Sequence, residues 1–193
     1  MNILKQATSY LQQNGLITAE LAPWFSYGLS RTLLSAVTYS VLLLLGWFLC
    51  GFLQTLVYLI AFASLRKHVG GWHASTPLRC LCCSILQVFL CLGVLYPVCM
   101  QMPYVTIMGI SFLSGMSVIA LAPLPPQKMH ITTKEFTVLK KLARKVLVVE
   151  TLLVCVLLPF RLTAFSLLVS LGMGCAAFSL WIAKPKKRRR NKP

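Results

Sequence analysis

The sequence predicts an all-α protein that crosses a membrane several times. The chain has 193 residues, of which 58% are hydrophobic, and its mean hydropathy is +0.77. Long apolar stretches without charge alternate with short segments that carry Lys, Arg, Pro and Gly. A water-soluble domain needs more charged surface than this composition supplies, so that class is excluded.

The apolar stretches predict about six transmembrane helices. The stretch 33–65 carries no charge and is too long for one span of roughly 20 residues. It is therefore predicted to form a helical hairpin that turns near Cys50-Gly51. The six predicted spans are about 32–49, 52–65, 81–100, 104–122, 146–160 and 163–183.

The last three spans are separated from their neighbours by polar or proline-containing segments. Met102-Pro103 divides the third span from the fourth, the polar stretch 123–145 precedes the fifth, and Pro159-Phe160-Arg161 precedes the sixth. The fifth span is short, so its helix could also begin earlier, near Lys134, and enter the bilayer obliquely.

The N-terminal segment, residues 1–30, is predicted to lie at the membrane surface. Residues 2–13 place Ile3, Leu4, Ala7, Tyr10 and Leu11 on one helical stripe, and Asn14-Gly15 provides a stop. This pattern indicates an amphipathic interfacial helix. No signal-peptide pattern is visible, so we expect the mature chain to begin near Met1.

The charge distribution predicts that both termini are cytoplasmic. Nineteen Lys and Arg residues oppose three acids, for a net charge of +16. If six spans follow a cytoplasmic N-terminus, Arg161 is the one basic residue on the outer side of the membrane. This asymmetry agrees with the positive-inside rule. The tail 184–193 is interpreted as an anchor to anionic lipid, and nucleic acid is not an expected partner.

A candidate thiol site lies between the second and third spans. Gly70-Gly71 permits a tight turn, and Thr76-Pro77 resembles a helix N-cap followed by proline. Cys80 would then lie in the first turn of the third span, with Arg66 and Arg79 nearby to favour a thiolate. In this interpretation Cys80 is a nucleophile and His73 its general base.

Two other interpretations of this segment stay open. The glycines could simply turn a loop, with His73 solvated and Cys80 packed as a small hydrophobe, as we expect for Cys50, Cys91, Cys99, Cys155 and Cys175. Metal binding by His68, His73, Cys80, Cys82 and Cys83 is less favoured, because these cysteines point in different directions on a helix. No metal and no cofactor is therefore expected.

The segment resembles the AgrB family of accessory gene regulator proteins, and the resemblance covers nearly the whole chain. It rests on Arg66, Gly70-Gly71, Trp72-His73-Ala74, the interval from His73 to Cys80, and a basic stretch after the proline-rich segment 122–126. AgrB proteins are membrane cysteine endopeptidases that process a quorum-sensing propeptide. The adjacent Cys82 and Cys83 depart from a minimal pattern, so the nucleophile is assigned by its interval from His73.

The resemblance implies a bacterial cell-membrane enzyme whose active site is cytoplasmic and whose substrate is an AgrD-like propeptide. Cys80 would cleave off the C-terminal part of the peptide through an acyl-enzyme thioester, and an internal Cys or Ser would close a thiolactone or lactone. Arg66, Gly70 and Gly71 could orient the substrate, stabilise the developing charge or shape the loop. A basic stretch could dock the acidic part of the propeptide or only fix topology: Lys134, Lys140, Lys141, Arg144 and Lys145.

Glu150 is a functional candidate because an acid inside a bilayer is costly. It could orient His73. The favoured alternative is that its side chain snorkels toward Lys145 at the end of the helix.

The predicted organisation is one membrane-embedded peptidase domain, residues 1–183, followed by the basic tail. Small residues near Gly172 and Gly174 would permit close helix packing, and a homodimer is possible. The main rival is a non-enzymatic transporter or peptide exporter in which the segment with His73 and Cys80 is structural. A thiol acyltransferase or a metal-binding membrane protein is a second rival.

Overall fold

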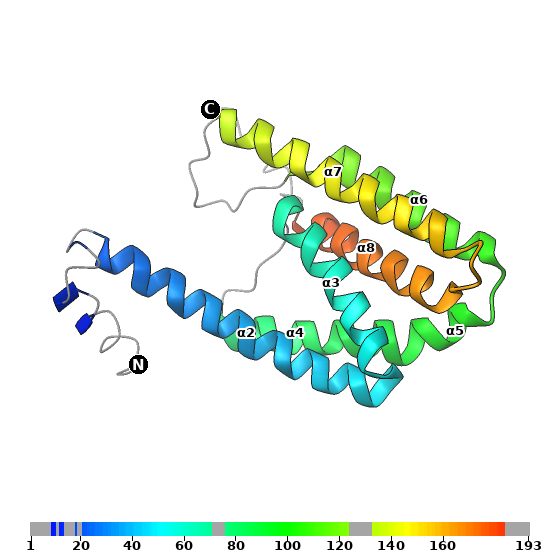
Figure 1. Cartoon of the computed structure of the whole chain (residues 1–193), viewed down its shortest axis with the longest axis horizontal. Coiled ribbons are helices and arrows are strands. Elements are labelled where there is room, and N and C mark those ends of the chain that lie inside the picture. The colour runs from blue at the N-terminus through cyan, green and yellow to red at the C-terminus, as the bar shows by residue number, and fades with distance from the viewer. Residues whose placement is uncertain are drawn as a thin grey trace, which may run out of the picture. The chain divides into compact units, whose positions relative to one another are not determined.

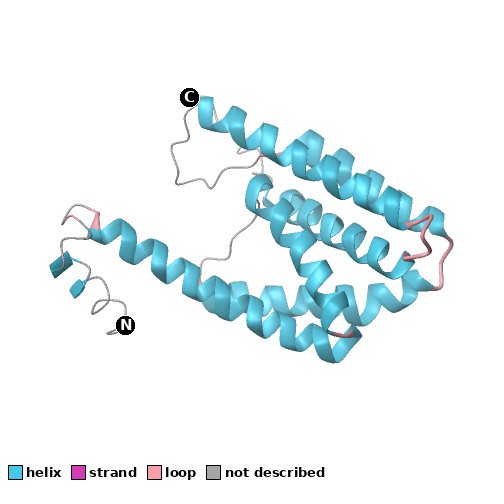
Figure 2. Ribbon diagram, in the orientation of Figure 1, coloured by secondary structure: helices cyan, strands magenta, loops and turns pink. Residues whose placement is uncertain are grey.

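The computed structural model describes residues 9–10, 12–13, 18, 21–70, 76–123 and 133–183. Helices account for nearly all of these residues, and no strand occurs among them (Figures 1 and 2). The predicted all-α fold is confirmed. Of the N-terminal interfacial helix only residues 9, 10, 12 and 13 are described, and all four are helical.

The chain divides into two compact units, Met1–Leu42 and Leu43–Pro193. The boundary falls within the first long helix, α2, which spans Ala22–Cys50. This helix begins well before the predicted start near residue 32. Pro23 does not prevent the early start, because the first turn of a helix has no use for the N–H that proline lacks.

The predicted break near Cys50-Gly51 is confirmed. Gly51 has φ 103°, a conformation that residues with a Cβ rarely adopt. Helix α3 follows immediately and spans Phe52–Val69. The one glycine therefore ends α2 and allows α3 to start in a new direction.

The third predicted span is one apolar stretch built from three helical pieces. These are α4 (Pro77–Val88), the π-helix η1 (Phe89–Leu95) and α5 (Tyr96–Met100). In a regular α-helix the ring of Pro97 would meet the carbonyl of Gly93. The wider π turns directly before Pro97 are the local adjustment that such a proline requires.

The remaining helices are α6 (Tyr104–Leu121), α7 (Thr133–Leu157) and α8 (Thr163–Ala183). The turns around Met102-Pro103 and Pro159-Phe160-Arg161 lie where the sequence predicts them. Helix α7 begins at Thr133, so of the two possible starts for the fifth span the earlier one, near Lys134, is correct.

Helix α8 forms the centre of the second unit and packs against α3, α6 and α7 (Figure 1). In the most apolar 18 residues of α8, 61% are buried within the protein, against 22% for α6. Within this centre Ser111 of α6 and Ser170 of α8 are hydrogen-bonded at 2.7 Å. Small and polar residues thus line the contacts of α8, as is common between helices in a membrane.

Helices α3 and α8 approach each other closely at Gly172. A Cβ at this position would lie 3.0 Å from the Ala61 Cβ and from the Phe62 backbone nitrogen. A Cβ at Gly174 would instead face Ser114 and Ile110 of α6. Both glycines therefore serve contacts within the chain, and they no longer support the suggested homodimer.

Four helices in the described part of the chain are long and apolar enough to cross a membrane. They are Phe25–Cys50, Pro77–Met100, Tyr104–Leu121 and Thr163–Ala183. Helices α3 and α7 are not among them, because α3 carries Arg66 and Lys67 in its last turn and α7 is basic in its first half. A polytopic membrane protein is confirmed, but the count of six spans is not.

We predict that Gly172→Ala destabilises the protein by about 1–3 kcal/mol, because the added methyl group forces α3 away from α8. The control is Gly109→Ala in α6, where a Cβ meets no atom within 4 Å. This second change should leave stability unchanged or raise it. Thermal unfolding of both variants in detergent checks the prediction, and equal melting temperatures would contradict it.

Candidate functional site

The C-terminal end of α3 is closed by Gly70. Its backbone N–H donates to the Arg66 carbonyl at 3.2 Å, and its φ of 76° with ψ of −150° lies in a region that is nearly restricted to glycine. The predicted turn at Gly70 is thus confirmed. Gly71 and His73 lie outside the described residues, so their roles stay predictions.

Arg66 connects this turn to the end of α8. Its Nη1 donates to the Gly70 carbonyl at 2.9 Å and to the Ser179 hydroxyl at 2.6 Å. Ser179 in turn donates to the Ala176 carbonyl at 2.7 Å. Ser179 could not be predicted as part of the site, because a serine in an apolar helix does not reveal its partner on another helix.

The start of α4 has the predicted cap. Thr76 is extended, and its hydroxyl accepts a hydrogen bond from the Arg79 backbone N–H at 3.4 Å, with Pro77 at the first helical position. The Cys80 N–H donates to the Thr76 carbonyl at 3.1 Å and closes the first helical turn. Cys80 therefore lies in the opening turn of the span, as predicted.

Cys80 differs in exposure from the two neighbouring cysteines. Its side chain is half-buried, whereas Cys82 and Cys83 are exposed. The Cys80 carbonyl accepts from the Ser84 hydroxyl at 2.9 Å, and the thiol makes no hydrogen bond to another described residue. The structure thus places Arg66, Gly70 and Ser179 together and leaves Cys80 outside this group.

Of the five cysteines expected to pack as small hydrophobes, Cys155 differs. Cys91 and Cys99 are buried, and Cys50 and Cys175 are half-buried, but Cys155 is exposed on α7.

Glu150 is buried, with only 5% of its surface exposed. Its Oε1 lies 2.5 Å from the Ser64 hydroxyl of α3. The snorkelling interpretation is therefore wrong: the side chain points into the helix packing and not toward Lys145. One turn after Ser64, the His68 Nδ1–H donates to the Ser64 carbonyl at 2.8 Å.

The basic residues of α7 lie away from its buried face. Ala143, Leu147, Glu150 and Val154 are buried at intervals of three or four residues. Lys134 belongs to the first turn of the helix, Lys140 is half-buried, and three side chains are exposed: Lys141, Arg144 and Lys145. The exposed three form a charged surface that a binding partner can reach.

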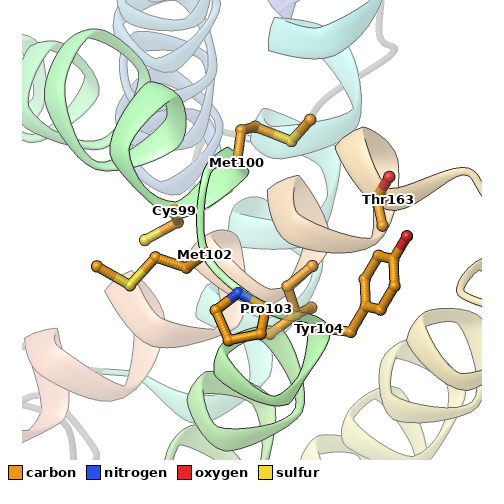
Figure 3. A pocket seen from close by; sticks show the side chains of 7 residues that line it. Cys99, Met100, Met102, Pro103, Tyr104 and Thr163 are labelled. Atoms are coloured by element: carbon orange, nitrogen blue, oxygen red, sulfur yellow. The ribbon is translucent and has the colours of Figure 1, made fainter.

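A small cavity of about 180 Å³ lies at the turn between α5 and α6 (Figure 3). Its lining includes Met102, Tyr104 and Thr163. Thr163 begins α8, whereas Ser179 is near the other end of that helix. The cavity is therefore remote from the Arg66 turn and is no part of the candidate site.

In the described ranges, no three His, Cys, Asp or Glu side chains are grouped so that they could hold a metal ion. His73, one of the ligands considered in the metal interpretation, lies outside those ranges.

Fold and site together define a polytopic α-helical membrane protein with a half-buried cysteine in the first turn of a spanning helix. A family model described as accessory gene regulator B, AgrB, matches residues 4–180. The chain belongs to the AgrB family. This membership gives it a role in processing the peptide of the accessory gene regulator quorum-sensing system. Neither the curated proteins nor the solved structures contain a match.

We predict that Gly70→Ala lowers the stability of the turn at Gly70, which Arg66 holds, by about 1–3 kcal/mol. Alanine is strained at the φ and ψ observed there. Hydrogen exchange of the last turn of α3 should accelerate, while that of α6 should not. Gly109→Ala serves again as the control for the loss of a glycine. Unchanged exchange in Gly70→Ala would contradict the importance of this turn.

Proposed function

We propose that the protein is a cysteine endopeptidase that cleaves an AgrD-like propeptide and promotes its cyclisation. His73 takes the proton from the Cys80 thiol, and the sulfur attacks the scissile carbonyl. The amide C–N bond breaks, and the leaving amine receives the proton from His73 as the C-terminal part departs. The N-terminal part stays bound to Cys80 as a thioester.

The second step transfers the acyl group to the peptide itself. An internal Cys or Ser of the bound peptide loses its proton to His73 and attacks the thioester carbonyl. The bond to Cys80 breaks, the Cys80 sulfur recovers the proton, and a thiolactone or lactone ring remains. The reaction requires proximity of the two reacting groups and exclusion of water, both of which a membrane-side site favours.

The position of Cys80 is the observation that carries this proposal. A helix side chain points back toward the N-terminus of its helix, so the Cys80 sulfur is directed toward the turn capped by Thr76. The partly positive end of a helix favours negative charge nearby. Cys82 and Cys83 lack the interval of seven residues from His73 that the family pattern requires.

Arg66 and Gly70 are proposed to shape the site more than to touch the substrate. Arg66 holds the Gly70 carbonyl and Ser179, so its guanidinium fixes the turn that leads into the His73 segment. Gly71 is proposed to continue this turn. A backbone N–H of the turn could then serve the oxyanion of the transition state.

The basic residues of α7 are proposed to bind the acidic C-terminal part of the propeptide. Lys140 and Lys141 are the central pair, with Arg144 and Lys145 one turn later and Lys134 at the helix start. Charges of this kind attract an acidic peptide and orient it before cleavage.

The site, both termini and the basic tail are proposed to face the cytoplasm of a bacterial cell membrane. The end of α3, the start of α4 and the start of α7 all carry basic residues, and short basic segments remain on that side. The tail 184–193 would bind anionic lipid. The amphipathic leader of the propeptide would lie on the same surface.

Substitution of the proposed pair tests the mechanism. Cys80→Ala and His73→Ala are expected to abolish cleavage of a co-expressed AgrD-like propeptide, because each removes a group that the first step requires. Cys82→Ala and Cys83→Ala are matched controls on the same helix and should process normally. Mass spectrometry of the peptide gives the readout. Loss of processing in Cys82→Ala with normal processing in Cys80→Ala would overturn the assignment.

The same experiment distinguishes the peptidase from a peptide exporter. A peptide exporter without peptidase activity would leave the propeptide uncleaved in every variant and in the wild type. If the protein is a thiol enzyme, we also expect an alkylating reagent at neutral pH to modify Cys80 before the other seven of its eight cysteines. Equal cleavage by the wild type, Cys80→Ala and His73→Ala would exclude the proposed mechanism.

Charge reversal on α7 tests the docking surface. The double change Lys140→Glu and Lys141→Glu should raise KM about tenfold or more and change kcat little, since it weakens substrate binding rather than the chemical step. The control Lys140→Arg with Lys141→Arg keeps the charge and should behave as wild type. Equal amounts of each variant in the membrane fraction exclude an insertion defect. Unchanged KM after reversal would leave these residues with a topological role alone.

A further inference from the structure

Among the described residues, Glu150 is the only acid whose side chain is buried. It occupies the interior face of α7 together with Ala143, Leu147 and Val154. Its Oε1 contacts the Ser64 hydroxyl at 2.5 Å, and its Oε2 is buried with no hydrogen-bond partner among the described residues. Such a position is unusual for a carboxyl group and calls for a physical reason.

The contacts of Glu150 fit a neutral carboxylic acid. An ionised carboxylate in this place would have one hydroxyl as its sole described partner and no described cation beside it. A buried charge without a counter-charge costs several kcal/mol. The neutral acid avoids this cost and still makes the hydrogen bond.

The Ser64 hydroxyl supplies a second reason. Its oxygen lies 3.0 Å from the Ala61 carbonyl, which can only accept, and 2.5 Å from Glu150 Oε1. One hydroxyl hydrogen cannot be fully shared between two acceptors. If Glu150 carries a proton on Oε1, it donates to Ser64, and Ser64 donates to Ala61, so both contacts of the Ser64 hydroxyl are satisfied.

The location of Ser64 gives this bond a role in the site. Ser64 precedes Arg66 by two residues, and Arg66 holds the Gly70 turn and Ser179 of α8. The last two turns of α3 are thereby attached to α7 through Glu150 and to α8 through Ser179. The chain continues from Gly70 directly into the segment that contains His73.

We propose that Glu150 is a neutral carboxylic acid that positions the end of α3, and with it the His73 segment, through its hydrogen bond to Ser64. It is a positioning residue and does not act as a charged partner of His73. The link to catalysis rests on the proposed peptidase function, whereas the protonation of Glu150 and its hold on α3 do not.

Infrared difference spectroscopy tests the protonation directly. The chain has only three acids, so the spectrum of wild type minus Glu150→Gln at neutral pH should show the C=O band of one carboxylic acid. Glu135→Gln is the matched control, because Glu135 is exposed on the same helix, and it should retain that band. A wild-type spectrum without a carboxylic acid band would overturn the proposal.

Hydrogen exchange and peptide processing test the positioning. Glu150→Gln keeps a neutral donor and should protect the last turn of α3 as the wild type does, whereas Glu150→Ala should accelerate exchange there about tenfold, the loss of roughly one hydrogen bond. Processing should follow the same order. A Glu150→Gln variant that is folded but as inactive as Glu150→Ala would show that the charge matters and would overturn the proposal. If the wild type cleaves no propeptide, the peptidase function fails while the spectrum and the exchange rates still decide this inference.

Discussion

The close approach of α3 to α8 at Gly172 is the contact on which the described second unit depends. Only hydrogen at this position lets Ala61 and the Phe62 backbone approach the central helix so closely. The same crossing brings Arg66 within reach of Ser179, two helical turns further along α8. The packing of small residues in the interior therefore determines where the turn at Gly70 begins.

The breaks between helices could be predicted from the sequence, because glycine and proline act locally. Gly51 and Gly70 adopt conformations closed to most residues, and Thr76-Pro77 forms a cap from its own side chains. The start of α2 at Ala22 differs from the prediction, which assigns residues 1–30 to an interfacial segment, because proline at position 23 fits the first turn of a helix.

Contacts between helices could not be predicted, since no sequence pattern pairs residues that are far apart in the chain. Ser64 and Ser179 carry no signal that connects them to Glu150 and Arg66. The predicted snorkelling of Glu150 toward Lys145 was wrong for a related reason. The sequence shows that Lys145 is near Glu150 in the chain, but it does not show which face of α7 is buried. The pair Cys80 and His73 was predicted from the residues of its own segment and from the family resemblance, and the structure places Cys80 in the first turn of α4.

The proposed thioester intermediate would explain a site at the membrane side, because such an intermediate must be protected from water and held beside the peptide nucleophile. The most direct test uses the wild-type protein and an AgrD-like propeptide whose ring-forming Cys or Ser is replaced by Ala. We expect the peptide's N-terminal part to accumulate on Cys80, seen as a mass increase that hydroxylamine removes. Cleavage of this peptide without any covalent adduct, or an adduct on Cys82 or Cys83, would contradict it.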